Sequence, residues 1–300
     1  MRLCVTGTRG QISSALQAVG WPSVEVIALG RPSFDLADRA SVLAAIEAAR
    51  PDVVVSAAAY TAVDQAETEC EQAFLINDVG AGHVAEAAAK VGVPVIHVST
   101  DYVFDGQKPT PYQEDDPTAP VSVYGASKRA GEERVLAANP KAIVLRTSWV
   151  FSYEGSNFLR TMLRLAADRA RIRVVSDQFG APTYAPDLAA ACVTIGRRVT
   201  SEPDSRDHYG TFHVTGGGDT SWAGFASAIF ASARARGAKG ADVQPIATSE
   251  YPTPATRPAN SRLDGTRVAE VHGIRLPHWA DAMNRCLDRL IATDGRAESL

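Results

Sequence analysis

Tyr124 and Lys128 are the residues of this chain whose types and spacing most clearly suggest chemistry. They lie four positions apart in the segment VYGASKRA, and that spacing places two side chains on one face of a helix. A phenol has a pKa of about 10, so it exchanges protons poorly at neutral pH, but a neighbouring ammonium group stabilises the phenolate and lowers that pKa. The pair therefore predicts a general acid–base group. An exposed helical pair without a function would show the same spacing.

Thr100 is the second candidate for a role in catalysis. The segment VIHVSTDYVFDG reads as a buried strand that ends in Ser99, Thr100 and Asp101. Ligands bind at the carboxyl ends of strands in parallel sheets, so the Thr100 hydroxyl can hydrogen-bond the substrate oxygen that Tyr124 protonates. A Ser-Thr pair can also cap a turn. The order of the motifs along the chain favours the functional interpretation, and it follows the plan of an extended short-chain dehydrogenase/reductase.

The opening segment RLCVTGTRGQISSAL predicts a strand, a glycine-rich turn and a helix. Gly7 would allow a tight turn, and Gly10 would let the backbone approach a pyrophosphate at the start of the helix. Ser13 stands where a third small residue, usually Gly or Ala, is expected. The pattern predicts a dinucleotide site, although a simple strand-to-helix turn would also fit it.

Arg31 indicates which dinucleotide is bound. An NAD site usually has Asp or Glu about 20 residues after the turn, at the end of the second strand. Here that strand ends in Leu29, Gly30 and Arg31, without a carboxylate, and a guanidinium group suits the 2′-phosphate of NADPH. We therefore predict NADPH, bound through Arg31 and with Arg9 as a further candidate. A solvated arginine after a strand is the alternative, and NADH is then possible.

Short β-branched runs alternate with alanine-rich amphipathic segments across the first half of the chain. The runs barely alternate between polar and apolar residues, which is typical of strands buried on both faces. The predicted strands are RLCVTG, VEVIAL, DVVVSAAA, PVIHVST and AIVLRTSWV, and the predicted helices are ISSALQAV, RASVLAAIEAAR, CEQAFLINDVGAGHVAEAAAKVG and SKRAGEERVLAANP. This order predicts an α/β fold with a Rossmann-type doubly wound parallel sheet.

The alternation of strands and helices breaks after about Val150. We expect residues 1–150 to form an NAD(P)-binding Rossmann domain and residues 151–300 to form a smaller C-terminal lobe that mainly binds substrate. The sheet can also recruit a strand and a helix from the second half. The polar end, residues 291–300, is expected to be frayed.

Composition excludes several classes of protein. A net charge of −4 over 300 residues gives no basic face for nucleic acid. No apolar run reaches the ~20 residues that cross a bilayer, and the N-terminus has no signal-peptide pattern, so we expect a cytoplasmic protein without a membrane partner. The cysteines, which we expect to be free thiols, lie far apart: Cys4, Cys70, Cys192 and Cys286.

Eight motifs together carry a resemblance to a known family. They are GTRGQIS, AAAYTAVDQAE, STDYVFDG, YGASKRAGE, RTSWVF, NFLRTMLRLA, DQFGAPT and YPTPATRPANSRLD. In this order and spacing, from residue 1 to about 290, the chain closely resembles the dTDP-4-dehydrorhamnose reductases. The resemblance implies NADPH-dependent reduction of the C4 ketone of a dTDP-linked 4-keto-6-deoxysugar, dTDP-4-dehydro-β-L-rhamnose, in the last step of dTDP-rhamnose biosynthesis.

The resemblance also implies roles for individual residues. It makes Thr100, Tyr124 and Lys128 the catalytic group. The implied cofactor contacts are Gly10, Gln11 and Ile12 in the opening turn, Asp35 and Leu36 beside the adenine, and Ala59, Tyr60 and Thr61 beneath the nicotinamide ribose, with Tyr124 and Lys128 also at the cofactor. The implied substrate contacts are Val63, Thr100, Asp101, Tyr124 and Trp149.

The loop from Arg257 to Arg262 adds two guanidinium groups that can hold a sugar nucleotide's diphosphate. Exposed arginines beside a proline loop are also common without such a role. Some relatives dimerise around magnesium held by glutamates, one of them in the first helix. Residues 11–19 contain no acid here, so no magnesium or other metal is predicted, and a monomer or a homodimer is open.

Two alternatives stay open at this stage. The same chemistry on a different nucleotide-linked 4-keto-6-deoxysugar would use the same motifs. A non-catalytic regulatory subunit, resembling the β subunit of methionine adenosyltransferase, would share the fold and keep a nucleotide site. The Thr100, Tyr124 and Lys128 set argues against the second alternative.

Overall fold

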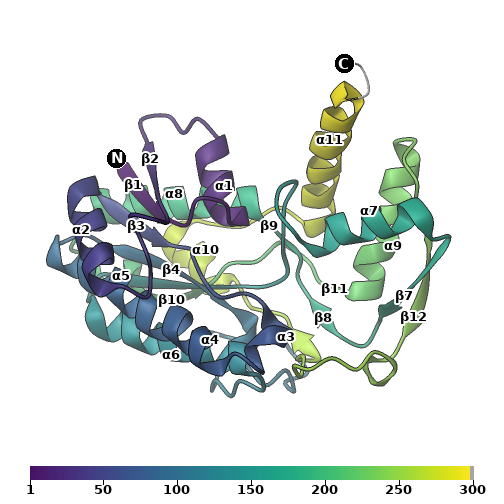
Figure 1. Ribbon diagram of the computed structural model, residues 1–300, viewed down its shortest axis with the longest axis horizontal. Coiled ribbons are helices and arrows are strands. Elements are labelled where there is room, and N and C mark those ends of the chain that lie inside the picture. The colour runs from purple at the N-terminus through teal and green to yellow at the C-terminus, as the bar shows by residue number, and fades with distance from the viewer. Residues whose placement is uncertain (298–300) are drawn as a thin grey trace.

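A six-stranded parallel sheet forms the centre of the computed structural model, which describes the backbone of residues 1–297 and the side chains of residues 1–291 (Figure 1). Its strands lie in the order β10-β5-β4-β3-β1-β2. Their bounds are β1 Arg2–Thr6, β2 Glu25–Leu29, β3 Val53–Ser56, β4 Val95–Thr100, β5 Ala142–Thr147 and β10 Gly210–His213. The strand order changes direction at β1, and ligands bind beyond the carboxyl ends of the strands at such a point.

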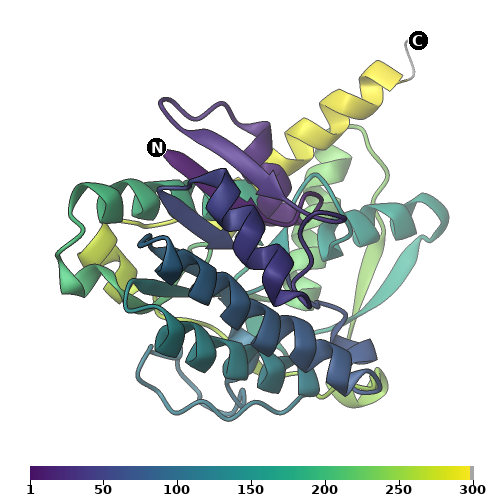
Figure 2. The same ribbon diagram turned by 60° about the vertical axis from the view of Figure 1, so that its left-hand side comes forward.

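Helices cover both faces of this sheet. One face carries α1 (Gln11–Ala18), α8 (Ala185–Ser201) and α10 (Thr266–His272), and the other carries α2 (Arg39–Ala49), α5 (Ala81–Lys90) and α6 (Val123–Ala138). Figure 2 shows α5 and α6 side by side. Leu3 and Val5 of β1 pack in the first layer, whereas Cys4 between them packs in the second. Both sides of the strand are thus apolar, and the predicted Rossmann-type doubly wound fold is confirmed.

A smaller lobe with its own apolar core lies beside the sheet, on the right of Figure 1. It contains α7 (Phe158–Asp168), α9 (Trp222–Ala235), α11 (Trp279–Ala297) and the parallel pair β7 (Arg171–Val175) and β12 (Asp242–Ile246). Short pairings outside the central sheet are β6 (Val150–Phe151) with β9 (Thr183–Tyr184), and β8 (Phe179–Gly180) with β11 (Thr220–Ser221) and β13 (Asn260–Ser261). Two further short helices, α3 (Val63–Ala66) and α4 (Cys70–Phe74), follow β3.

The chain passes between the two parts more than once. After residue 150 it builds lobe elements, returns through α8 and β10 to the sheet, and then enters the lobe again through α9. A domain division near residue 150 stays a prediction. We expected 291–300 to be frayed; α11 continues to Ala297, and residues 298–300 lie outside the described part. Across the described helices, none combines the length and apolarity that a membrane span requires.

Candidate active site

A cavity of about 830 Å³, which we call the main cavity, opens at the carboxyl ends of β1, β3, β4 and β5. It brings together predicted residues from widely separated segments. Those that line it are Gly7, Gly10, Gln11, Ile12, Ala59, Thr61, Val63, Thr100, Asp101, Tyr124, Lys128, Trp149 and Arg257.

A neighbouring cavity of about 430 Å³, the side cavity, holds the remaining predicted residues. It is lined by Arg31, Asp35, Leu36 and Tyr60, and it shares Gly7, Arg9 and Ala59 with the main cavity. An extended ligand can therefore run from one cavity to the other across the glycine turn.

The glycine turn has the conformation that the sequence predicts. Gly7 has a φ of +89°, in the region that favours glycine, and its N–H donates to Leu29 O at 2.7 Å. Gly10 is the N-cap of α1. Ser13 is 1% exposed, and its hydroxyl donates to Gly10 O at 3.0 Å. Serine therefore fits the third small position and adds a hydrogen bond that closes the turn.

Arg31 lies at the side cavity with its side chain 71% exposed. It forms an ion pair with Asp35 at 3.1 Å. The pKa of Asp35 is lowered, first by a hydrogen bond from the backbone N–H of Ala37 and then by Arg31. The guanidinium group is thus held at the edge of the cavity by a carboxylate and remains open to solvent.

The start of α6 lies directly against the end of β4. Ser122 caps the helix by accepting from Gly125 N at 3.1 Å. A Cβ on Gly125 would collide with the backbone oxygen of Tyr102, so glycine permits this close approach. As a result the Tyr124 phenol comes close enough to Thr100 for that hydroxyl to affect its pKa.

The pKa of Tyr124 differs from what the sequence suggests. We expected Lys128 to lower it, but in the structure burial raises the pKa of the phenol, and the charge of Asp101 raises it further. The nearby Thr100 hydroxyl, which lowers the pKa, only partly opposes these effects. Tyr124 is therefore fully protonated at neutral pH, which suits a proton donor.

Lys128 is buried one helical turn beyond Tyr124. Its ammonium group donates to Val98 O at 2.7 Å, and it lies 3.2 Å from His97 Nε2. Burial lowers the pKa of Lys128 to about 8, although the charge of Glu132 acts in the opposite direction. The amine therefore changes its charge close to physiological pH.

Asp101 places a carboxylate in the wall of the main cavity. Thr100 Oγ1 donates to Asp101 Oδ1 at 2.9 Å, whereas Oδ2 is buried without a hydrogen-bond partner among the described residues. Burial raises the pKa of Asp101 to about 6, more than the neighbouring hydroxyls of Ser261 and Thr100 lower it. Such an oxygen can accept a hydrogen bond from a ligand hydroxyl.

Trp149 forms an aromatic wall of the same cavity. Its backbone has a φ of +49°, which is uncommon for a large side chain. Its ring stacks on Trp222, the first residue of α9, with centroids 3.5 Å apart and planes at 10°. Gly180 packs against the ring edge. The indole is thus held from two sides.

Comparison with known proteins identifies the family. The model of the RmlD substrate binding domain matches residues 1–292. The chain belongs to the RmlD family. The dTDP-4-dehydrorhamnose reductase of Sinorhizobium fredii is 52% identical over 291 residues, covering 97% of this chain and 98% of that protein. The dTDP-4-dehydrorhamnose reductase of Burkholderia thailandensis is 44% identical, over 97% of this chain and 100% of that protein.

Solved structures agree with this assignment. Bacillus anthracis dTDP-4-dehydrorhamnose reductase, solved in complex with NADP, has a TM-score of 0.88 at 35% identity and covers 96% of this chain and 99% of that chain. The Clostridium acetobutylicum dTDP-4-dehydrorhamnose reductase has a TM-score of 0.89 at 35% identity, over 97% of this chain and 100% of that chain.

This RmlD-family chain has a further cavity that the sequence motifs did not reveal. It measures about 720 Å³ and shares Phe158, Trp222 and Arg257 with the main cavity. Three arginines are among its lining residues, Arg169, Arg171 and Arg173, of which Arg173 forms an ion pair with Glu250 at 2.9 Å, and we call it the arginine-lined cavity. The segment RARIRVV could have indicated it, since arginines at every second position mark one face of a strand.

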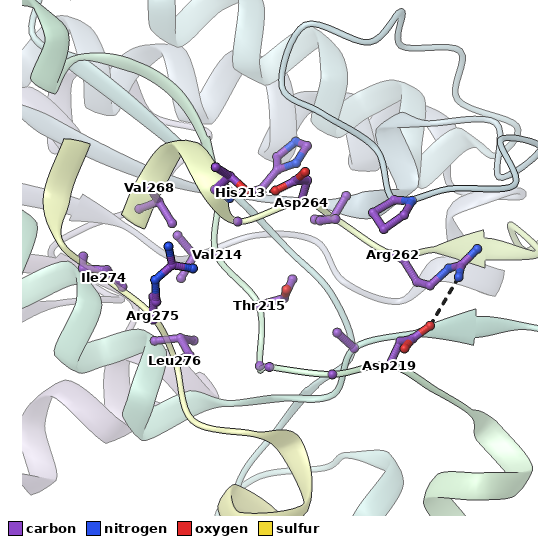
Figure 3. Close-up of a pocket in the computed structure, with 18 residues that line it drawn as sticks. His213, Val214, Thr215, Asp219, Arg262, Asp264, Val268, Ile274, Arg275 and Leu276 are labelled. Carbon is purple, nitrogen blue, oxygen red and sulfur yellow. Dashed lines mark hydrogen bonds and ion pairs between the residues drawn. The ribbon is translucent and has the colours of Figure 1, made fainter. Parts of the chain in front are cut away.

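Arg262 does not share the surroundings of Arg257 in this family member. Arg257 lines the main and arginine-lined cavities, whereas Arg262 lines a separate cavity of about 620 Å³ beyond β10. There it forms an ion pair with Asp219 at 3.3 Å (Figure 3). It also donates to the backbone oxygen of Pro109. The expectation that both arginines hold one diphosphate is therefore wrong for Arg262.

The raised pKa of Asp101 makes a prediction about stability. The folded pKa of about 6 exceeds the ordinary 3.8, so this carboxyl contributes stability below pH ~4 that is lost as the pH rises through ~6. Asp101→Asn should therefore raise the free energy of unfolding at neutral pH, on the order of 2 kcal/mol, while weakening substrate binding. Denaturant unfolding of the wild type and the variant, below pH ~4 and at neutral pH, checks the direction of this change in the free energy of unfolding.

Asp177→Asn is a matched control for this measurement. The pKa of Asp177 is lowered by a hydrogen bond from Thr248, so loss of this carboxylate should reduce the free energy of unfolding at neutral pH. A lower unfolding free energy for Asp101→Asn would contradict the assignment of Asp101 as a strained carboxylate.

Proposed function

We propose that this chain reduces the C4 ketone of dTDP-4-dehydro-β-L-rhamnose to dTDP-L-rhamnose with NADPH, the last step of dTDP-rhamnose biosynthesis. One observation carries the proposal. Thr100 and Tyr124, with Lys128 one turn further along α6, line the same cavity as the glycine turn. Membership of the RmlD family, with full-length relatives named dTDP-4-dehydrorhamnose reductase, supports it.

The residues present fit NADPH. The N-terminus of α1 offers backbone N–H groups to a pyrophosphate, and Gly7 in its left-handed conformation makes the tight turn that leads into this helix. Arg31 offers a guanidinium group at the edge of the side cavity for a 2′-phosphate. When bound, the cofactor supplies the hydride that reduces the ketone carbon.

The chain's own residues hold the ketone and supply the proton. Tyr124 donates its phenol proton to the substrate oxygen, and its raised pKa keeps that proton in place until the oxygen gains charge. Thr100, by turning its hydroxyl away from Asp101, donates to the same oxygen and fixes its direction. Lys128 carries the positive charge that stabilises the phenolate left behind. These groups are aligned before reaction, which lowers the entropic part of the barrier.

The rest of the substrate fits the surrounding walls. Asp101 Oδ2, buried and without a partner among the described residues, accepts from a sugar hydroxyl. Trp149 and Val63 offer apolar surface to the deoxysugar, because a methyl group packs well on an indole face. The dTDP moiety extends past Arg257 into the arginine-lined cavity, where guanidinium groups suit its phosphates.

A direct assay tests this function. The purified chain should consume NADPH, seen as loss of the near-ultraviolet absorbance of reduced nicotinamide, only when the freshly generated dTDP-4-keto sugar is added. A panel of other nucleotide-linked 4-keto-6-deoxysugars separates this substrate from its alternatives. Higher kcat/KM with another sugar would assign the chain to that sugar, and no turnover with any of them would refute the reductase function.

Arg257 gives a prediction about substrate binding. Its guanidinium group pairs with Asp64 Oδ2 at 2.7 Å and donates to Tyr102 Oη at 3.2 Å, so it is held where two cavities meet. Arg257→Gln should raise the KM for the keto sugar about tenfold or more, with little change in kcat, because a charge-assisted hydrogen bond is lost. Arg285→Gln, which breaks a surface pair with Asp187, is the control. An unchanged KM would remove Arg257 from this role.

Arg31 gives a prediction about cofactor choice. Arg31→Ala should raise the KM for NADPH by about tenfold and leave the KM for NADH unchanged, because only NADPH carries the 2′-phosphate. Arg39→Ala, which breaks an exposed pair with Glu86, should change neither constant. An equal rise in KM for NADPH and for NADH would show that Arg31 does not bind the 2′-phosphate.

The setting of the reaction is also part of the proposal. We place it in the cytoplasm, supported by four free cysteines, three of them buried, which suit a reducing compartment. A monomer and a homodimer both stay predictions, and light scattering of the purified chain distinguishes them.

A further inference from the structure

His97 is a buried histidine that the mechanism above does not use. It lies on β4, three residues before Thr100, and is 1% exposed. Its Nε2 is 3.2 Å from Lys128 Nζ, and its Nδ1 is 3.2 Å from Ser56 Oγ on β3. Both ring nitrogens therefore have buried polar partners, Lys128 on α6 and Ser56 on β3.

The contacts of Lys128 fix which nitrogen of His97 carries the proton. A lysine ammonium group has donors and no acceptor, so a protonated Lys128 must donate to a His97 Nε2 that bears a lone pair. The single ring proton then lies on Nδ1 and is donated to Ser56. Burial, followed by the charge of Lys128, lowers the pKa of His97 well below its usual range, so the ring stays neutral.

Other charged groups around Lys128 do not replace this contact. Glu132 lies one turn along α6, but its carboxylate is bound by Arg146 at 2.8 Å and by Ser99 at 2.5 Å. It acts on Lys128 through space, with its charge largely balanced by Arg146. The ammonium group has two direct acceptors among the described residues, Val98 O and His97 Nε2.

We propose that His97 is a positioning residue for this reaction: as a neutral acceptor it orients the Lys128 ammonium group and stabilises its charged form. It acts through Lys128 and does not touch the substrate. Strand β4 then contributes to the site in two ways. Its last residue is Thr100, whose hydroxyl it places, and its His97 helps to keep Lys128 charged. This inference rests on the reductase function proposed above.

The decisive variant is His97→Leu, compared with His97→Gln. Leucine removes the acceptor, so Lys128 should lose its proton more readily, and the alkaline limb of the kcat profile should move about one unit to lower pH. At neutral pH kcat should fall about tenfold, with the KM of the keto sugar unchanged. Glutamine offers an amide oxygen in place of Nε2 and should restore the limb.

Further variants separate the role of His97 from a general loss of folding. Ser56→Ala removes the partner of Nδ1 and should move the limb in the same direction by a smaller amount. His272→Leu alters a buried histidine that lines none of the cavities described above, and it should leave the limb in place. In a Lys128→Met background, His97→Leu should cause no additional loss, because the two residues act as a unit.

A measurement on the free protein tests the geometry without turnover. Imidazole ¹⁵N NMR should show a neutral His97 with its proton on Nδ1 across neutral pH. A proton on Nε2, or an alkaline limb that does not move in His97→Leu, overturns the role of His97 alone. An inactive wild-type chain refutes the reductase function, so the two failures are distinguishable.

Discussion

Tyr124→Phe should lower kcat by about 10²–10⁴, the usual contribution of a positioned proton donor. Phenylalanine keeps the ring and its edge-to-face packing on Tyr102, whose centroid lies 5.6 Å away, so the fold of the site should not change. The variant lacks only the hydroxyl that lies near Thr100 and that we propose donates its proton to the ketone oxygen. Steady-state NADPH consumption gives kcat, and fluorescence titration gives the affinity for NADPH, which should stay within about twofold of the wild type because no phosphate contact is lost.

Tyr209→Phe is the matched control, because its hydroxyl donates to Pro203 O on the surface and lines none of the cavities described above. The pH profile adds a second readout. Since the pKa of Tyr124 is raised, the phenol should remain a donor throughout the neutral range, and an alkaline limb near pH 8 should belong to Lys128. Near-normal turnover of Tyr124→Phe would remove Tyr124 from catalysis.

Gly180→Ala should lower kcat/KM about 10²-fold, although residue 180 has no side chain that could take part in the reaction. A Cβ there would lie 2.5 Å from Trp149 Cε2. The indole cannot move away freely, because its other side stacks on Trp222 and its backbone is already in the left-handed region. The ring must shift into the main cavity and displace the sugar, and a misplacement of about 1 Å is enough for a loss of this size. Affinity for NADPH should be unchanged.

Gly20→Ala controls for the added methyl group, because a Cβ at Gly20 meets nothing within 4 Å. If Gly180→Ala retains full kcat/KM with the keto sugar, Trp149 is not a wall of the substrate site. A variant that loses NADPH binding as well would indicate general misfolding instead of a displaced indole.

Local patterns made the fold predictable, and with it the meeting of Thr100, Tyr124 and Lys128 in one cavity. Strands such as DVVVSAAA are apolar on both faces, and only a sheet covered on both sides accommodates them. The spacing of Tyr124 and Lys128 depends on helix geometry alone, and Thr100 stands at a strand end whose position the alternation of elements already indicates. The family resemblance supplied the residues between these points, and the structure brings them into two adjoining cavities.

What the sequence could not show depends on contacts between distant segments. The pKa of Tyr124 is raised because surrounding walls bury it and Asp101 lies close, whereas helix spacing suggested only the effect of Lys128. Arg257 and Arg262 are five residues apart, yet the chain between them passes from one cavity to another. In the sequence His97 has no feature that distinguishes it from other buried strand residues. Its contact with Lys128 depends on how α6 packs against β4.

The return of the chain to the central sheet has a consequence for biosynthesis on the ribosome. Strand β5 is buried along its whole length, and among the described strands it is β10, Gly210–His213, that pairs with its outer edge. Until those residues leave the exit tunnel, the nascent polypeptide presents an open, apolar strand edge, which is prone to pair with other chains. Timely synthesis of the second half therefore protects the first half from aggregation.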